Sequence, residues 1–177
     1  MATHEEIVSS LRSRFAGESF EAKPLLEGGA KTTDQYYIRL EPNRLLDVMK
    51  FLRDDGQMKF EQLIDLTCID YLNFPNASDR FGVIYSLLSL THNHRIWIKC
   101  FVNDPKPTVP SVTSIWKGAE WMEREVFDMF GISFDGHPDL RRILTWDTFE
   151  ANPLRKDYPL RGRGEREDFQ IVHRDDA

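Results

Sequence analysis

The chain has 177 residues, of which 41% are hydrophobic and 29% are charged, a composition typical of one globular domain with a single hydrophobic core. Its formal net charge of −6 argues against general nucleic-acid binding, which needs a basic surface. Cys68 and Cys100 lie far apart and outside any C-x-x-C pair, so the usual spacing for iron–sulfur ligation is missing. Both are expected to be buried strand residues.

The N-terminal sequence MATHEEIVSS lacks the basic and apolar regions of a signal peptide. The apolar runs are also too short to span a membrane. We therefore expect a soluble protein that stays in the compartment where it is made and that contacts a membrane only through a partner.

The chain begins with a predicted helix. Thr3 and Glu6 form a capping box, apolar residues then recur at helical spacing, and Gly17 ends the helix. Residues 20–26 are predicted to form a short edge strand, because Pro24 has no N–H to donate to a neighbouring strand.

A turn at Gly28-Gly29 separates this edge strand from a predicted strand over Gln35–Leu40. Pro42 then suits the first turn of a second helix, and Gly56 lies just past its end. One side of that helix is apolar, with Leu45, Val48, Met49 and Leu52.

Three further strands are predicted over residues 60–71, 80–90 and 95–102, and residues 91–94 are short enough to connect the last two as a hairpin. Runs of strands separated by helices indicate an α+β domain. We expect a mostly antiparallel sheet with helices packed on one face.

The remaining chain has less periodicity. Three prolines predict an irregular connector over residues 103–110, and a helix over 120–130 is predicted to end at Gly131. We expect residues 1–130 to form the α+β domain, residues 131–164 an extended segment that wraps around a partner, and residues 165–177 a polar, frayed tail.

The predicted helix 120–130 has apolar residues on two sides, so two surfaces must cover it. Its carboxylates Glu123, Glu125 and Asp128 raise the alternative of acid–base catalysis. Ion pairing with nearby arginines is the preferred interpretation, because bidentate arginine–carboxylate pairs suit interfaces.

The histidines do not indicate a metal site. His137 has no second ligand at metal-binding spacing, so we expect it to structure a loop. His92 and His94 are expected to be solvated residues at a hairpin tip. Glycine-rich nucleotide-binding loops and the G-x-S-x-G hydrolase motif are absent from the sequence.

Basic residues outnumber acidic ones between positions 137 and 163. A solvated tail is one interpretation of this region. Its many apolar residues favour another, because the segment has no periodicity that would bury them on its own domain. Wrapping around a partner, with arginine and aromatic anchors, accounts for both features.

The sequence EREVFDMFGISFDGHPDLRRIL, residues 123–144, resembles the signature of the thirty-kilodalton subunit family of respiratory complex I, the proton-pumping NADH:quinone oxidoreductase. In bacterial enzymes this is the C subunit. NPLRKDYPLRG, residues 152–162, is also similar to the family, and the strands LIDLTCIDYL and RFGVIYSLLSL match more loosely. The resemblance extends from about residue 60 to residue 164.

The resemblance implies a non-catalytic subunit of the peripheral arm, on the cytoplasmic side of the bacterial inner membrane or on the matrix side of an organelle. It also implies that the chain holds no cofactor, and that the iron–sulfur clusters, flavin and quinone belong to partner subunits. The main partner would be the quinone-site D subunit, with the iron–sulfur B and I subunits nearby. The expected interface and signature residues are Glu123, Arg124, Glu125, Asp128, His137, Arg141, Arg142, Arg155, Lys156, Asp157 and Tyr158.

Related subunits occur in membrane-bound hydrogenases, formate hydrogenlyase and ferredoxin-dependent quinone reductases, and the motif alone does not separate these. Two alternatives from other classes also stay open. One is a stand-alone enzyme that uses the carboxylates and His137, which would need its own pocket and a perturbed titrating group. The other is a free adaptor that captures acidic partners.

Overall fold

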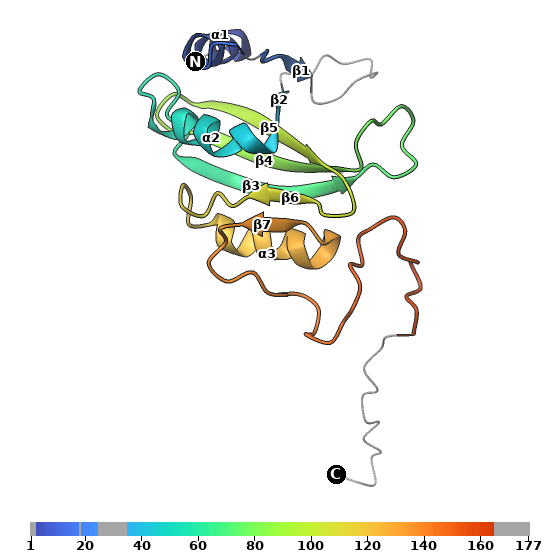
Figure 1. The fold of residues 1–177 in the computed structure, drawn as a ribbon. Helices are drawn as coiled ribbons and strands as arrows, with labels where there is room; N and C mark the ends of the chain where they lie inside the picture. The colour runs from blue at the N-terminus through green and yellow to red at the C-terminus, as the bar shows by residue number, and fades with distance from the viewer. Residues whose placement is uncertain (1–2, 18, 25–34, 165–177) are drawn as a thin grey trace.

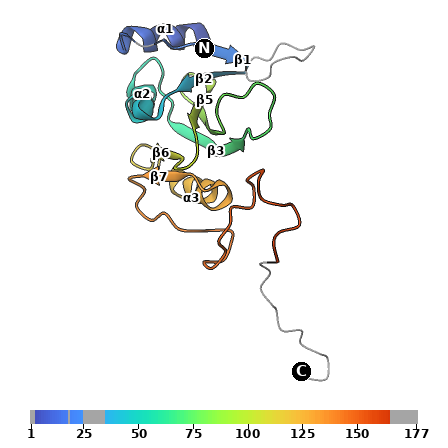
Figure 2. The same ribbon diagram turned by 45° about the vertical axis from the view of Figure 1, so that its right-hand side comes forward.

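A five-stranded sheet forms the middle of the protein, which the computed structural model describes over residues 3–17, 19–24 and 35–164. Helix α1 lies at one end of the molecule, and helix α3 and the C-terminal segment lie at the other (Figures 1 and 2). The predicted Gly28-Gly29 turn, the last two residues of the predicted strand 20–26 and the predicted tail 165–177 lie outside the described residues.

Helix α1 (His4–Arg14) begins at the predicted capping box. Thr3 Oγ1 accepts the N–H of Glu6 at 3.2 Å, and Glu6 Oε2 accepts the N–H of Thr3 at 2.8 Å. Strand β1 (Ala22–Pro24) follows at the edge of the sheet, where it pairs antiparallel with β2 (Tyr36–Leu40). The edge position predicted from the proline is confirmed.

The sheet has the strand order β1-β2-β5-β4-β3, in which β3 is Gln62–Asp70, β4 is Phe81–Ser89 and β5 is His94–Val102. The pairing of β2 with β5 is parallel, and the other three pairings are antiparallel. This confirms the mostly antiparallel sheet of the predicted α+β fold.

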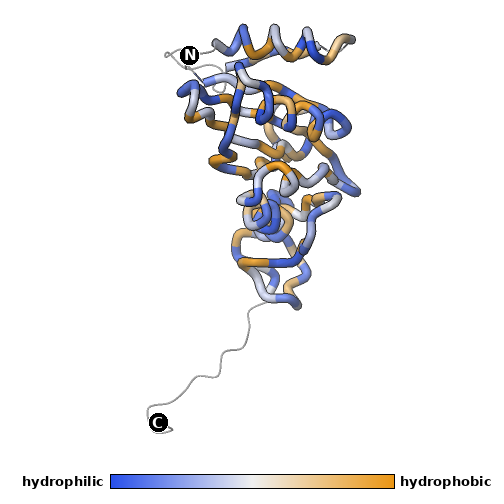
Figure 3. The backbone as a smooth tube through the Cα atoms, turned by 90° about the vertical axis from the view of Figure 1, so that its left-hand side faces the viewer, coloured by the Kyte–Doolittle hydropathy of each residue, from blue (hydrophilic) through white to orange (hydrophobic). Residues whose placement is uncertain are grey.

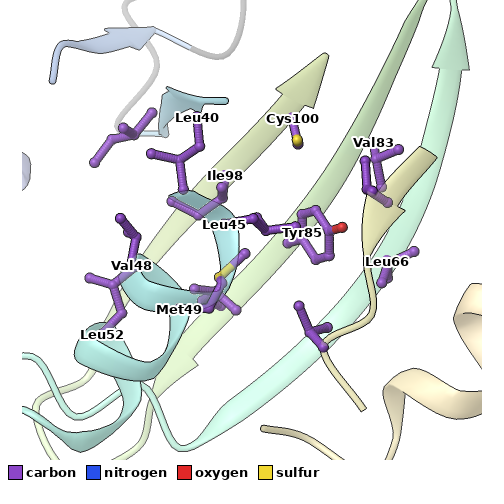
Figure 4. Close-up of a cluster of buried hydrophobic side chains, with 14 of the residues drawn as sticks. Leu40, Leu45, Val48, Met49, Leu52, Leu66, Val83, Tyr85, Ile98 and Cys100 are labelled. Atoms are coloured by element: carbon purple, nitrogen blue, oxygen red, sulfur yellow. The ribbon is translucent and has the colours of Figure 1, made fainter. Parts of the chain in front are cut away.

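Helix α2 (Leu45–Asp54) follows a 3₁₀ turn (Pro42–Arg44) and covers the sheet with its apolar side. Its predicted core residues are completely buried, and Leu45 and Met49 lie on the side of the helix that faces Tyr85 (Figure 4). Register places Leu66, Tyr85, Ile98 and Ile38 in one row across four strands. Residues of α1, α2 and α3 all join this single core.

The prediction of solvated histidines at the hairpin tip is wrong for His94. This residue begins β5 opposite Ser89, is 6% exposed, and places its Nε2 2.7 Å from the Met58 carbonyl oxygen. His92 Nε2 similarly lies 2.9 Å from the carbonyl oxygen of Gly56. Both rings therefore contact backbone carbonyl oxygens of the turn that follows α2. The residue types of a hairpin turn do not indicate such a long-range contact.

The predicted irregular connector contains a strand, β6 (Thr108–Pro110), which pairs in parallel with β7 (Ser133–Asp135). Helix α3 (Ala119–Phe130) lies between these two strands in the sequence. Val109 is 0% exposed and Phe134 is 3% exposed, so the two strands belong to the core. Three-residue strands are too short to show a period in sequence. The core therefore continues past residue 130, the expected end of the domain.

Gly131 ends α3 as predicted and has a φ of 76°, in the left-handed region. A Cβ at this position would lie 2.7 Å from Asn152 Oδ1. Gly136 has a similar φ of 81° but open space around it.

We expect Gly136→Ala to lower the free energy of unfolding by about 1 kcal/mol through backbone strain alone. Gly131→Ala should cost about 1 kcal/mol or more beyond that, because Asn152 must also move. Urea unfolding of both variants measures the difference. Equal losses in the two variants would show that the contact with Asn152 is unimportant.

Candidate functional site

The C-terminal segment (residues 131–164) wraps around the end of α3 and then runs beside the core domain (Figure 1). Figure 3 shows hydrophobic and hydrophilic stretches alternating along it. Ile132 is 0%, Phe134 is 3% and Phe149 is 7% exposed. The expectation that this segment cannot bury apolar residues on its own domain is therefore wrong for these three.

The C-terminal segment supplies hydrogen-bond donors to carbonyl groups of the last turn of α3, where a helix leaves its final carbonyl groups without internal partners. Asn152 Nδ2 donates to the Asp128 carbonyl oxygen at 2.9 Å and to the Phe127 carbonyl oxygen at 3.3 Å. The Leu154 N–H donates to Met129 at 3.0 Å. Arg155 Nη1 donates to the Phe130 carbonyl oxygen at 3.3 Å.

Asp128 forms a second attachment between α3 and the segment. Its buried carboxylate accepts the N–H groups of three consecutive residues through Oδ2, at 3.0, 2.8 and 2.8 Å, from Ile143, Leu144 and Thr145. Oδ1 accepts Arg142 Nη1 at 2.6 Å and the Thr145 hydroxyl. Burial opposes ionisation, but the hydrogen bonds from Thr145, Ile143 and Leu144 outweigh it and lower the pKa of Asp128 to about 2.

Arg124 and His137 hold the start of the segment. Arg124 Nε and Nη2 donate to the carbonyl oxygens of Arg141 and Arg142 at 3.1 and 3.0 Å. His137 Nε2 lies 3.0 Å from the Glu120 carbonyl oxygen, and its side chain is 1% exposed. These two predicted interface residues therefore bind this chain's own backbone.

Glu123 is 0% exposed, with Oε1 accepting the Val112 N–H at 2.7 Å. Burial raises its pKa to about 7, partly offset by the Ser111 hydroxyl and the Val112 N–H. The predicted ion pairing with arginine is confirmed for Asp128 with Arg142 but is wrong for Glu123, for which the described residues give no such pair. Glu125 is exposed to solvent.

The three helix carboxylates therefore do not share a site. One is sealed in the core, one faces solvent and one is fully occupied by hydrogen bonds. A catalytic pair needs two carboxylates that face the same substrate. The perturbed pKa of Glu123 results from burial in a position that no substrate reaches.

A charged network attaches the end of the segment to the sheet. Arg155 Nη2 donates to Asp104 at 2.8 Å, and Arg80 Nη2 lies 2.6 Å from Asp157. Both guanidinium groups lie within 5 Å of the buried Phe81 ring, at 4.8 and 4.9 Å from its centroid. Asp70 Oδ2 also accepts the Lys156 N–H at 2.8 Å.

Besides Thr145, which directly follows the first stretch of resemblance, four residues of these attachments were not predicted from the sequence: Asp70, Arg80, Asp104 and Asn152. Asn152 lies inside the NPLRKDYPLRG stretch, which was the available signal for it. Asp70 and Arg80 lie within LIDLTCIDYL and RFGVIYSLLSL, the two stretches that match the family more loosely, whereas Asp104 lies in the connector, outside every stretch that carries the resemblance.

Outward-facing residues of the segment form a different set. Arg141 and Lys156 have exposed side chains, Asp157 is about half exposed, and Tyr158 packs edge-on against Phe149. Large apolar side chains also face solvent on α3 and the segment; they are Trp121 (61% exposed), Leu144 (63%), Trp146 (36%), Leu154 (54%) and Leu160 (104%).

The fold and these attachments define an α+β domain whose C-terminal segment is fixed to its last helix and presents apolar side chains outward. Residues 38–164 match the family model described as "Respiratory-chain NADH dehydrogenase, 30 Kd subunit". The chain belongs to this family, as the sequence resemblance predicted.

Three similar proteins support the assignment. The C subunit of the NADH-quinone oxidoreductase of Caulobacter vibrioides is 55% identical over 118 residues, which cover 67% of this chain and 58% of the relative. That of Coxiella burnetii is 39% identical over 193 aligned positions, which cover 93% of this chain and 82% of the relative. A solved structure titled "Nqo5 of the trypsin-resistant fragment (1-134)" is 30% identical with a TM-score of 0.63, covering 78% of this chain and all of that one.

Within the described residues, the helices are too short or too polar to cross a membrane.

Replacing Asp128 with Asn should release residues 142–145 from α3, because one amide oxygen cannot accept the five hydrogen bonds and Arg142 loses its partner. We expect the free energy of unfolding at pH 7 to fall by about 2–4 kcal/mol. Asp147→Asn, an exposed carboxylate in the same segment, is the control and should change it by well under about 1 kcal/mol.

The pH dependence gives a second measurement. The folded pKa of Asp128 is below its ordinary value, so its stabilisation is present at neutral pH and is lost as the pH falls from about 4 toward about 2. Unfolding curves of Asp128→Asn should lack this acid-dependent part. A variant that keeps the wild-type acid dependence would contradict the assigned role.

Proposed function

We propose that this chain is a structural subunit of the peripheral arm of proton-pumping NADH:quinone oxidoreductase, docked on the quinone-site D subunit beside the iron–sulfur B and I subunits. It acts on the cytoplasmic side of the bacterial inner membrane, contributes no catalytic residue and supports electron transfer from NADH to quinone by positioning its partner. Membership of the family supports the assignment of this chain to that complex. The outward-facing apolar residues of the attached segment support the docking role.

The observation that carries this proposal is how the C-terminal segment divides its residues. Arg142 and Arg155 face inward and hold it in place, whereas Leu144, Leu154 and Leu160 face water. Apolar side chains on a well-ordered surface are typical of an interface with another protein. The segment therefore presents a preformed surface.

The expected interface residues divide into two roles on this basis. Exposed Glu125, Arg141 and Lys156 can contact a partner directly. Asp128, Arg142 and Arg155 contact this chain's own backbone and carboxylates, so they act on docking by holding the segment in place.

The docking surface can be tested with Leu160→Asp, which places a charge on a fully exposed side chain and should leave folding intact. We expect binding to the quinone-site subunit of the same complex to weaken about tenfold or more, since burying an unpaired charge at an interface is costly. Leu90→Asp, at an exposed apolar position in the β4–β5 turn, is the matched control.

Co-purification of the complex and titration of the two subunits would both measure this effect. If Leu160→Asp and Leu90→Asp bind the quinone-site subunit as tightly as the wild type, the segment is not the docking surface. Loss of thermal stability in Leu160→Asp alone would instead assign this residue to the fold.

We also propose that the chain itself holds no redox group. Cys68 and Cys100 are buried, and burial raises the pKa of both thiols, that of Cys100 to about 12, which disfavours the thiolates that bind iron. Anaerobically purified protein should be colourless and free of flavin and iron, by absorbance and by metal analysis. Stoichiometric iron or flavin would overturn this proposal.

A further inference from the structure

Glu123 and His137 lie together in the core but do not form an ordinary ion pair. Glu123 Oε2 and His137 Nε2 are 4.0 Å apart, and both side chains are sealed from solvent, at 0% and 1% exposure. A charge-assisted hydrogen bond between nitrogen and a carboxylate oxygen is typically about 2.7–2.9 Å long. The contact is therefore too long for one.

The hydrogen bonds of His137 identify its protonation state. Its Nδ1 accepts the N–H of Asp139 at 3.0 Å, so this nitrogen carries no proton. Its Nε2 lies 3.0 Å from the Glu120 carbonyl oxygen, which can only accept. The ring is thus the neutral imidazole with its proton on Nε2, and this proton is directed at the helix backbone.

The carboxyl group of Glu123 has little to stabilise a negative charge. Oε1 accepts the Val112 N–H, whereas Oε2 is buried and has no hydrogen-bond partner among the described residues. Within that same part of the chain, no lysine or arginine lies within ion-pair distance of it. An unpaired carboxylate at this depth would cost several kcal/mol, so such a group keeps its proton instead.

The neighbouring titratable groups do not change this balance. From β4, the buried phenol of Tyr85 is uncharged; burial, with smaller contributions from Cys100, Glu123 and Cys68, raises its pKa. The turn after β6 contributes the hydroxyls of Ser111 and Thr113, which bond to each other. The Ser111 hydroxyl also lowers the pKa of Glu123, but by less than burial raises it. On α3 itself, Arg124 is engaged by the carbonyls of the C-terminal segment.

We propose that Glu123 and His137 form a neutral pair in the folded protein, in which Glu123 keeps its proton at mildly acidic pH and thereby holds His137, and the C-terminal segment that follows it, against α3. Ionisation of Glu123 would leave a charge that attracts the Nε2–H of His137, which lies 4.0 Å from Oε2. That proton can reach Glu123 only by leaving the Glu120 carbonyl oxygen. Alkaline pH should therefore loosen the turn that begins the segment.

The sign of the pH effect follows from proton binding. Burial raises the folded pKa of Glu123 from 4.5 to about 7, so between these values the folded protein binds more protons than the unfolded chain. Stability from this group is full below about pH 4.5 and is lost as the pH rises through about 7. The unfolding equilibrium constant should change by on the order of 10²-fold over this window from Glu123 alone.

The test uses the full chain and Glu123→Gln, which mimics the protonated carboxyl in shape. Wild-type protein should lose stability between pH 5 and 8 by this factor, and Glu123→Gln should lack that loss and equal or exceed the wild type above about pH 7. Glu150→Gln, at an exposed position on the C-terminal segment, removes one carboxylate and should keep the wild-type dependence. Denaturant unfolding at a series of pH values gives all three curves.

A second measurement applies even if Glu123→Gln does not fold. Carboxyl ¹³C chemical shifts of wild-type protein labelled at glutamate should show one buried group still protonated at pH 6, and ¹⁵N shifts of the neutral His137 ring should show its proton on Nε2. An ionised Glu123 at pH 6, or a neutral His137 ring with its proton on Nδ1, would overturn the proposal. So would a Glu123→Gln variant that folds but keeps the wild-type pH dependence.

Discussion

The end of helix α3 is the constraint on which the rest of this structure depends. The last turn of α3 contains no basic residue, and it contains Asp128, whose negative charge is unfavourable next to the carbonyl end of a helix dipole. The helix therefore needs donors and positive charge from elsewhere. The C-terminal segment supplies both, through the Asn152 amide, the Leu154 N–H and the guanidinium groups of Arg142 and Arg155. The irregular segment is held in one conformation because its donors form hydrogen bonds with the carbonyl groups at the end of the helix.

Features of the fold that depend on residues close together in the sequence were predicted correctly. The capping box, the edge proline, the apolar side of α2 and the glycine at the end of α3 each act within a few residues, and all four were found in the predicted places. The pairing of β6 with β7 and the network around Arg155 depend on residues far apart in the chain; Lys156 and Asp70, for example, are 86 positions apart. Sequence periodicity does not indicate such long-range contacts. For this reason, arginines that donate hydrogen bonds to groups of α3 in the same chain were predicted to contact a partner.

The signature residues acquire a different physical meaning in the structure. The side chains of Glu123, Asp128 and His137 are buried, and each bonds to a backbone group more than ten positions away in the sequence. Substitution of any of them would alter the path of the segment before it altered any contact with another protein. The pattern therefore describes how this surface is built, and it also includes the exposed leucines, because Leu144 lies within residues 123–144 and Leu154 and Leu160 lie within residues 152–162.

Attachment of the segment at two places explains how an irregular chain can serve as a rigid surface. Residues 142–145 are held by Asp128, and residues 155–157 are held by Arg80, Asp104 and Asp70, with Phe149 buried between these points. A free segment would lose conformational entropy on binding, and this loss would reduce affinity. Here that entropy is lost during folding, and it is offset by buried hydrogen bonds to α3 and the sheet. Leu144, Leu154 and Leu160 then lie beside the fixed points, where a partner can cover them without ordering the chain anew.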